Sequence, residues 1–340
     1  MMTWKLREAD LLHLLKESNL EPSPGSPLGG LKPLGVAARL APIGDKPQLM
    51  EALSRVAGAE VVLGMVTLSP PREPEFSWFY GTANDGNYAY HGPAEDGGHE
   101  IVWPVDGFLL LRSLQAPLAM EIPSGKEEIS LVLDRSGFET LAAMTDLFQE
   151  KNLLALLKRT PAQEADFAEI ELLECCERSR NSQDLRWMVP RIQLIAPVGL
   201  RFSDEDLRRG LAALVAGELL AQRDGRFAPT PALGLVCSGL AATTGMSALS
   251  TQRRQKLSHL AAVRMADLGL WIIEFSEITA DDFNVRIAGM AQAEMYARMK
   301  AGLGMPAEKG AALRCPACAA ELRADARFCA KCGYRLASKR

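Results

Sequence analysis

Four cysteines near the end of the chain constrain its folding more than any other feature. Cys315, Cys318, Cys329 and Cys332 form two C-x2-C pairs that are separated by ten residues. Two residues between paired thiolates let a tight turn present both sulfurs to one metal, and two such turns complete a tetrahedral site. A segment of about 20 residues cannot bury enough surface to fold alone, so the metal must supply folding free energy.

The donor set indicates which metal this is and what it does. Four thiolates suit Zn²⁺, and they leave no open coordination position for a catalytic water. We therefore expect one structural zinc ion per chain, held by Cys315, Cys318, Cys329 and Cys332. An iron centre with the same ligands is the alternative. Residues 321–323 and 326–328 are expected to form two short strands between the cysteine pairs.

The tail also resembles a known family, the short bacterial four-cysteine zinc ribbons of the CPxC…FCxxCG type. The matching residues are Cys315-Pro316-Ala317-Cys318 and Phe328-Cys329-Ala330-Lys331-Cys332-Gly333, whereas Ala319 stands where the family usually has glycine. The resemblance implies a zinc-binding module, and such modules often serve to dock proteins.

Charge is unevenly distributed along the chain. Residues 309–340 carry +6, and because the whole chain carries −4, the remaining residues carry −10. An acidic body is a poor match for a nucleic-acid-binding protein, although the basic tail leaves that option open.

Two further features of the sequence indicate the cellular compartment of the protein. The seven cysteines are odd in number and include the adjacent pair Cys175 and Cys176, which does not look like a disulfide framework. No export signal or membrane-spanning stretch is apparent, so we expect a cytoplasmic protein.

The sequence predicts an α+β fold with four parts. These are an N-terminal α/β module at 1–125, a helical winged-helix-like module with a terminal β-hairpin and helix at 126–302, a flexible linker at 303–313 and the zinc ribbon at 314–338. Helical modules are thereby joined to small antiparallel β-layers. Apolar periodicity predicts helices at 2–20, 48–58, 107–118, 138–158, 164–180, 254–268 and 290–301, and strands at 61–68, 76–80, 87–91, 99–105, 129–134, 270–278 and 283–288.

Local signals within the second module are the strongest. Ser203 is a good N-cap, Asp224-Gly225 is a hairpin turn, and Pro231 suits the first position of a helix. The segment LVAGELLAQRDGRFAPTP resembles the recognition helix and wing of bacterial winged-helix proteins, and the resemblance extends over residues 160–235. It concerns fold rather than function.

A repeated pattern suggests an internal duplication. Residues 101–107 form a strand that ends at Gly107 before a helix, and residues 283–289 do the same at Gly289. Two copies would pack naturally about a pseudo-twofold axis. Secretion-associated chaperones of the ESX type have similar two-copy plans, although no motif in this chain carries that resemblance.

One group of residues is a candidate catalytic site. His91 and His99 flank a glycine-rich loop with three acidic residues, which would suit a metal or acid–base cluster, or simply a solvated hairpin. No established catalytic motif is present. We therefore predict a non-catalytic zinc-ribbon adaptor or scaffold that binds protein partners through its ribbon, its body or both, with a chaperone-like role in a secretion or other macromolecular assembly. The alternatives are a nucleic-acid-binding regulator that uses the winged helix and basic ribbon, and an enzyme whose site lies near His91 and His99.

Overall fold

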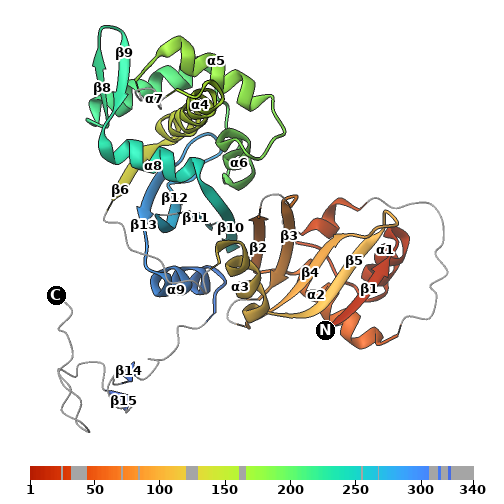
Figure 1. Ribbon diagram of the computed structural model, residues 1–340. Coiled ribbons are helices and arrows are strands. Elements are labelled where there is room, and N and C mark those ends of the chain that lie inside the picture. The colour runs from red at the N-terminus through yellow and green to blue at the C-terminus, as the bar shows by residue number, and fades with distance from the viewer. Residues whose placement is uncertain are drawn as a thin grey trace.

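A ten-stranded antiparallel sheet dominates the molecule (Figure 1). The computed structural model describes residues 1–23, 26–31, 44–69, 72–82, 85–119, 129–160, 166–253, 256–266, 268–305, 313–314 and 321–322. Within them the strand order is β1-β5-β4-β3-β2-β10-β11-β12-β13-β6. The strands are β1 Met2–Leu6, β2 Val61–Leu68, β3 Glu75–Gly81, β4 Asn87–Pro93, β5 His99–Asp106, β6 Ser130–Asp134, β10 Thr243–Arg253, β11 Lys256–Met265, β12 Gly269–Ser276 and β13 Asn284–Gly289.

The two halves of this sheet repeat one order of elements. In the first half a strand and a helix lead through a second helix to four antiparallel strands and a last helix. The second half repeats this order with β6, α4 (Arg135–Lys158), α8 (Pro231–Ala241), β10 to β13 and α9 (Gln292–Gly302). The halves meet where β2 and β10 pair antiparallel, from Val61↔Arg253 to Leu68↔Met246. This arrangement is compatible with the predicted duplication, in which β10 takes the place of β2. The helices are α1 Glu8–Glu17, α2 Lys46–Ala57, α3 Gly107–Gln115, α4 Arg135–Lys158, α5 Glu169–Arg180, α6 Met188–Ile195, α7 Asp204–Ala216, α8 Pro231–Ala241 and α9 Gln292–Gly302.

Helices cover both faces of the sheet. Successive residues of a strand point to opposite faces, and in β10 Ala248 packs in the core beneath α4 to α8 whereas Leu249 packs in the core with α3 and α9. On β2, Val62 contacts the core of α1 and α2 while Val66 contacts that of α4 to α8. The helical covers of the two halves therefore share one face, and α3 and α9 lie on the other.

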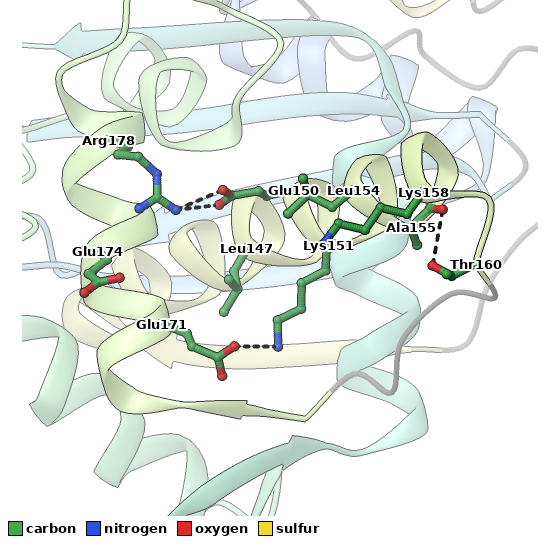
Figure 2. A pocket seen from close by; sticks show the side chains of 10 residues that line it. All are labelled: Leu147, Glu150, Lys151, Leu154, Ala155, Lys158, Thr160, Glu171, Glu174 and Arg178. Carbon is green, nitrogen blue, oxygen red and sulfur yellow. Dashed lines mark hydrogen bonds and ion pairs between the residues drawn. The ribbon is translucent and has the colours of Figure 1, made fainter.

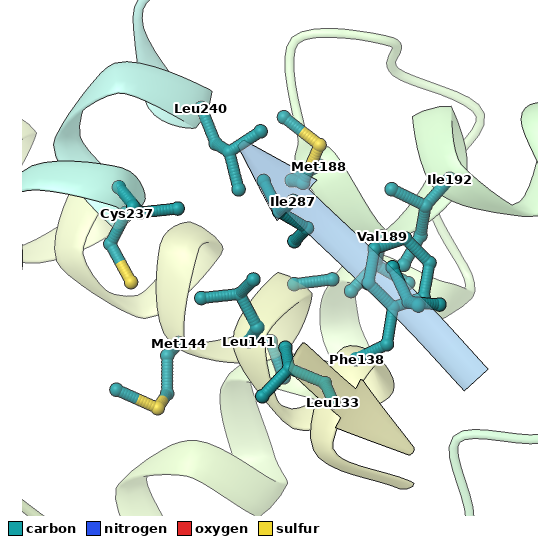
Figure 3. Packing of buried hydrophobic residues seen from close by; sticks show 14 of the residues in the cluster. Leu133, Phe138, Leu141, Met144, Met188, Val189, Ile192, Cys237, Leu240 and Ile287 are labelled. Carbon is teal, nitrogen blue, oxygen red and sulfur yellow. The ribbon is translucent and has the colours of Figure 1, made fainter. Parts of the chain in front are cut away.

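The helices inserted in the second half pack around the N-terminal part of α4. Figure 3 shows how side chains of α4, α6 and α8 meet those of β6 and β13. The contact between α4 and α7 is especially close, because a Cβ atom at Gly210 would lie 2.3 Å from the backbone oxygen of Ser136. A small sheet of order β7-β9-β8 completes this part; it consists of β7 Phe167–Ala168, β8 Leu220–Arg223 and β9 Arg226–Pro229.

Most elements that have local signals lie where the sequence predicts them. The Ser203 hydroxyl accepts a hydrogen bond from the Asp206 N–H at 3.1 Å, which confirms the N-cap, and Asp224-Gly225 connects β8 to β9. The body continues past the last helix, since Leu303 and Met305 are buried.

Three predicted helices are wrong in whole or in part. The segment predicted as a helix at 254–268 contains strand β11, which pairs with β10 on one side and β12 on the other. Its apolar residues are covered on both faces of the sheet, so they show no clean alternation. The first five residues of the predicted helix at 2–20 form strand β1, and the helix begins only at Glu8. In the predicted helix at 164–180, Phe167–Ala168 form β7 and the helix begins at Glu169, while residues 161–165 are outside the described part.

Candidate functional site

The predicted zinc ligands Cys315, Cys318, Cys329 and Cys332 lie outside the described residues. The described residues nearby form a two-stranded ladder in which β14 (Leu313–Arg314) pairs antiparallel with β15 (Glu321–Leu322). This pairing places Arg314, the residue before Cys315, beside Glu321. A four-thiolate donor set fits Zn²⁺. The strand predicted at 321–323 is present at Glu321–Leu322, and the one predicted at 326–328 lies outside the described residues.

His91 and His99 do come together in space. They lie on the paired strands β4 and β5, and Nε2 of His91 is 3.0 Å from Nδ1 of His99. Burial and the neighbouring imidazole lower the pKa of His91 to about 4. A pocket of about 670 Å³ lies beside the pair and is lined in part by Trp78 and Tyr80.

The acidic residues near this pair point elsewhere. Glu95 has a 96% exposed side chain that lies 3.8 Å from Lys5, and Asp96 accepts a hydrogen bond from the Gly98 N–H. Within the residues that the structure describes, no group of three or more His, Cys, Asp or Glu side chains is arranged to hold a metal. The pair is thus a cross-strand contact next to a pocket.

The exposed face of α7 is the surface that would meet nucleic acid in a winged helix. Its two arginines are engaged by carboxylates of the same chain: Arg208 Nε lies 2.7 Å from Glu169, and Arg209 lies 3.2 Å from Glu205. On the wing, Arg226 is held at 2.7 Å by Asp166. Intramolecular pairing leaves these cations less available for phosphates.

The far end of α4 carries a surface that the sequence did not predict. This helix is 24 residues long, and its last turns carry Leu153, Leu154, Leu156 and Leu157, of which the last two are 73% and 80% exposed. We call these four residues the leucine surface. On a helix of 3.6 residues per turn they share one face. The opposite side carries Ala155, which is buried.

Ion pairs fix α4 to α5 just beneath the leucine surface (Figure 2). Arg178 on α5 binds Glu150 with its Nη2 atom 2.7 Å from Oε2, and Lys151 lies 3.3 Å from Glu171. These contacts surround a small pocket of about 220 Å³. They hold α4 against α5, while Leu156 and Leu157 remain exposed. The run Leu-Leu-Ala-Leu-Leu was the available signal, but apolar periodicity alone predicts burial rather than exposure.

The other cysteines do not form a reactive site. Cys175, Cys176 and Cys237 are buried and unpaired. Burial raises the pKa of the Cys176 and Cys237 thiols to about 12, and it raises the pKa of Cys175 as well. At neutral pH these thiols are therefore protonated and poor nucleophiles.

Comparison with known proteins identifies the C-terminal segment. Residues 311–336 match the family model of the zinc-ribbon domain. Among solved structures, the chain is similar to the Mycobacterium tuberculosis type VII secretion system chaperone EspG5, in its complex with a PE25-PPE41 dimer, with 10% sequence identity and a TM-score of 0.40. That alignment covers 90% of this chain and 97% of EspG5. No curated protein matches the sequence. Of the helices described, none combines the length and the apolar character that crossing a bilayer requires.

Proposed function

We propose that this chain is a non-catalytic adaptor that binds protein partners through its leucine surface and through a zinc ribbon on a tether. The observation that carries the proposal is the exposure of the leucine surface at the end of a rigid helix. Leu156 and Leu157 are each more than 70% exposed. Contiguous exposed apolar side chains are unfavourable in water, and they mark surfaces that another protein covers.

The zinc ribbon supports the same role. The segment that matches the family holds the four cysteines Cys315, Cys318, Cys329 and Cys332, and their thiolates would hold one Zn²⁺ with no position left for a substrate. The metal would supply folding free energy to a module too small to fold without it. The ribbon would then be a compact basic module beside an acidic body.

The nucleic-acid alternative has one structural observation in its favour. The order β7-β9-β8, with helices before it and a hairpin after α7, is compatible with the winged-helix part of the prediction. However, the exposed side of α7 has acidic residues at its start and alanines further along, and its arginines are paired with carboxylates. A recognition helix requires free basic or amide side chains, so this surface suits protein contacts better than DNA.

The test compares the full chain with matched variants in its native host. Leu156→Ser/Leu157→Ser alters the leucine surface, Cys315→Ser/Cys318→Ser disrupts the ribbon, and Phe108→Ser/Leu109→Ser serves as the control, because those residues are exposed on another face. A partner should co-purify with wild type and control after nuclease treatment, and the leucine variant should lose it.

The partner must then form a complex with the purified chain that has a fixed stoichiometry. The wild-type protein should also contain one zinc per chain, and the Cys315→Ser/Cys318→Ser variant should contain none. Two results would refute the adaptor role. One is the same set of co-purifying proteins in all variants, and the other is binding of the chain to DNA that is stronger with the basic tail than without it.

A further inference from the structure

The second half of the sheet ends in a strand that has a neighbour on one side only. Strand β6 is the last of the ten strands and pairs only with β13 among the described strands. Figure 1 shows β6, in yellow, at this border beneath the helices. An edge strand of this kind presents a row of backbone N–H and C=O groups to which another chain can add.

The register defines which groups face outward. The Gly289 N–H donates a hydrogen bond to the Ile129 carbonyl oxygen at 3.3 Å, so residue 129 faces β13. In an antiparallel ladder the direction of the backbone N–H and C=O groups alternates from one residue to the next. The backbone groups of Leu131 and Leu133 therefore face β13, whereas those of Ser130 and Val132 face away from it. The side chain of Val132 is 72% exposed.

A groove runs along this free edge. Strand β6 forms one wall, and the C-terminal part of α7 forms the other with Ala213, Leu214 and Gly217. Its volume is about 440 Å³. Because two of these three residues have little or no side chain, the wall leaves room for a polypeptide backbone and small side chains beside β6.

The charge around the groove is negative. Asp134 is the only ionisable residue among the described residues that line it, and the exposed Glu218 follows directly after Gly217. The groove lies between the C-terminal end of α7, where the helix dipole favours cations, and the N-terminal end of α4, where Asp134 already accepts the Gly137 N–H at 2.7 Å. The body as a whole is acidic. These features complement a basic occupant.

The opposite edge of the same sheet shows what a guarded edge looks like. Strand β1 takes the same place in the first half that β6 takes in the second, and it carries Lys5, whose Nζ lies 3.8 Å from Glu95 on the neighbouring hairpin. Lysine on an edge strand discourages the addition of further strands. Strand β6, with the sequence Ser-Leu-Val-Leu-Asp, has no cation.

We propose that the groove between β6 and α7 binds an extended, basic segment of a partner protein by β-strand addition. The inference deepens the proposed adaptor function and rests on it. A second copy of the chain is a poor occupant, because its own α7 would accompany its β6 and meet the first α7. An isolated strand brings no such obstacle. Its backbone would pair with Ser130 and Val132, its small apolar side chains would face Ala213 and Gly217, and its lysines or arginines would lie near Asp134 and Glu218.

The test uses the full chain and a labelled heptapeptide, acetyl-Lys-Val-Thr-Ala-Thr-Val-Lys-amide, in a fluorescence anisotropy titration. Val132→Pro removes the outward N–H with little change in the core, and Val132→Thr is the matched control that keeps it. Ala213→Trp fills the groove from its other wall and remains informative if the proline variant does not fold. We expect both blocking variants to raise the Kd at least tenfold, the threonine variant to stay within twofold, and a peptide with aspartate at both ends to bind at least tenfold more weakly.

Hydrogen exchange separates the possible occupants. The Val132 amide should exchange rapidly in the free chain and become protected when the peptide binds. Protection without peptide in a monomer would mean that the chain covers its own edge, and a dimer that Val132→Pro dissociates would mean that a second copy does; either result overturns the proposal. A peptide Kd that is the same in wild type, Val132→Pro and Ala213→Trp overturns the proposal as well. Because the leucine surface is unchanged in these variants, retention of the co-purifying partner reports separately on the adaptor function.

Discussion

Replacing Glu139 should destabilise the protein more than replacing any exposed acid. Glu139 lies in α4, is fully buried, and accepts a hydrogen bond from Arg135 Nε at 2.9 Å. It also accepts the backbone N–H groups of Arg201 at 3.0 Å and Phe202 at 3.2 Å. One carboxylate thus neutralises a buried guanidinium and fixes the segment that leads into α7.

The magnitude follows from what Glu139→Ala leaves behind. The Arg135 side chain is 8% exposed, so it would become a buried cation without its partner, which costs about 3–5 kcal/mol. The backbone N–H groups of Arg201 and Phe202 would also lose their acceptor. The loss at the buried Phe202 N–H costs about 1–3 kcal/mol unless water enters. Glu139→Gln keeps the volume and one acceptor oxygen, so its cost should be about half as large.

The assay is urea unfolding followed by far-ultraviolet circular dichroism. With a slope of about 3 kcal/mol per molar urea, a loss of at least about 4 kcal/mol lowers the midpoint by more than 1 M. Glu205→Ala is the matched control, because Glu205 also pairs with an arginine four residues away, Arg209, but its side chain is 86% exposed. Its midpoint should not move measurably. Equal shifts for Glu139→Ala and Glu205→Ala would refute the reasoning from burial.

Two further predictions concern packing and pH. Gly210→Ala should lower the free energy of unfolding in urea by at least about 2 kcal/mol, because its Cβ atom would lie 2.3 Å from the Ser136 carbonyl oxygen. Gly234→Ala in α8 is the control, because it has open space and should stabilise the protein. Equal effects of the two variants would contradict the close approach of α4 and α7. Burial lowers the pKa of His259 to about 4, so the unfolded chain takes up this proton first, and stability is lost as pH falls from 6.5 to 4, by up to about 3 kcal/mol. Burial raises the pKa of Asp146 to about 6, so the protonation of Asp146 stabilises the folded chain as pH falls and opposes the His259 effect. The His259 effect is therefore measured as the difference in thermal stability between wild type and His259→Gln at each pH. A difference that does not change with pH would refute the prediction.

Local chemistry explains which elements the sequence could predict. The Ser203 cap and the Asp224-Gly225 turn depend on side chains within three residues of one another, so their signals survive in any tertiary context. Strand β11 depends on its neighbours instead. Ala261 pairs with Ala248 on one side and Ile273 on the other, and these partners lie in the preceding and following strands rather than within a turn of Ala261. Its residues have no intrinsic preference strong enough to reveal the strand.

The candidate surfaces were hidden for a related reason. Periodicity identifies an apolar helix face but does not say whether another element of the chain covers it. Leu156 and Leu157 have the spacing of core residues and yet are exposed, while Leu147 on the same helix is buried. The edge position of β6 likewise depends on the order of all ten strands. The cysteine tail could be recognised because four ligands at fixed spacing need no tertiary context.

The two halves differ in a way that explains why the proposed interaction surfaces lie in the second one. Helix α1 follows the edge strand of the first half, has 10 residues, and buries Leu11, Leu14 and Leu15. Helix α4 occupies the equivalent place after β6 but has 24 residues, so its last turns extend beyond the helices that pack around its beginning. The same architecture therefore yields a covered apolar face and a guarded edge in one half, and an uncovered apolar face and an unguarded edge in the other. The first half would stabilise the continuous sheet, and the second would contact partners at both ends of the unit formed by β6 and α4.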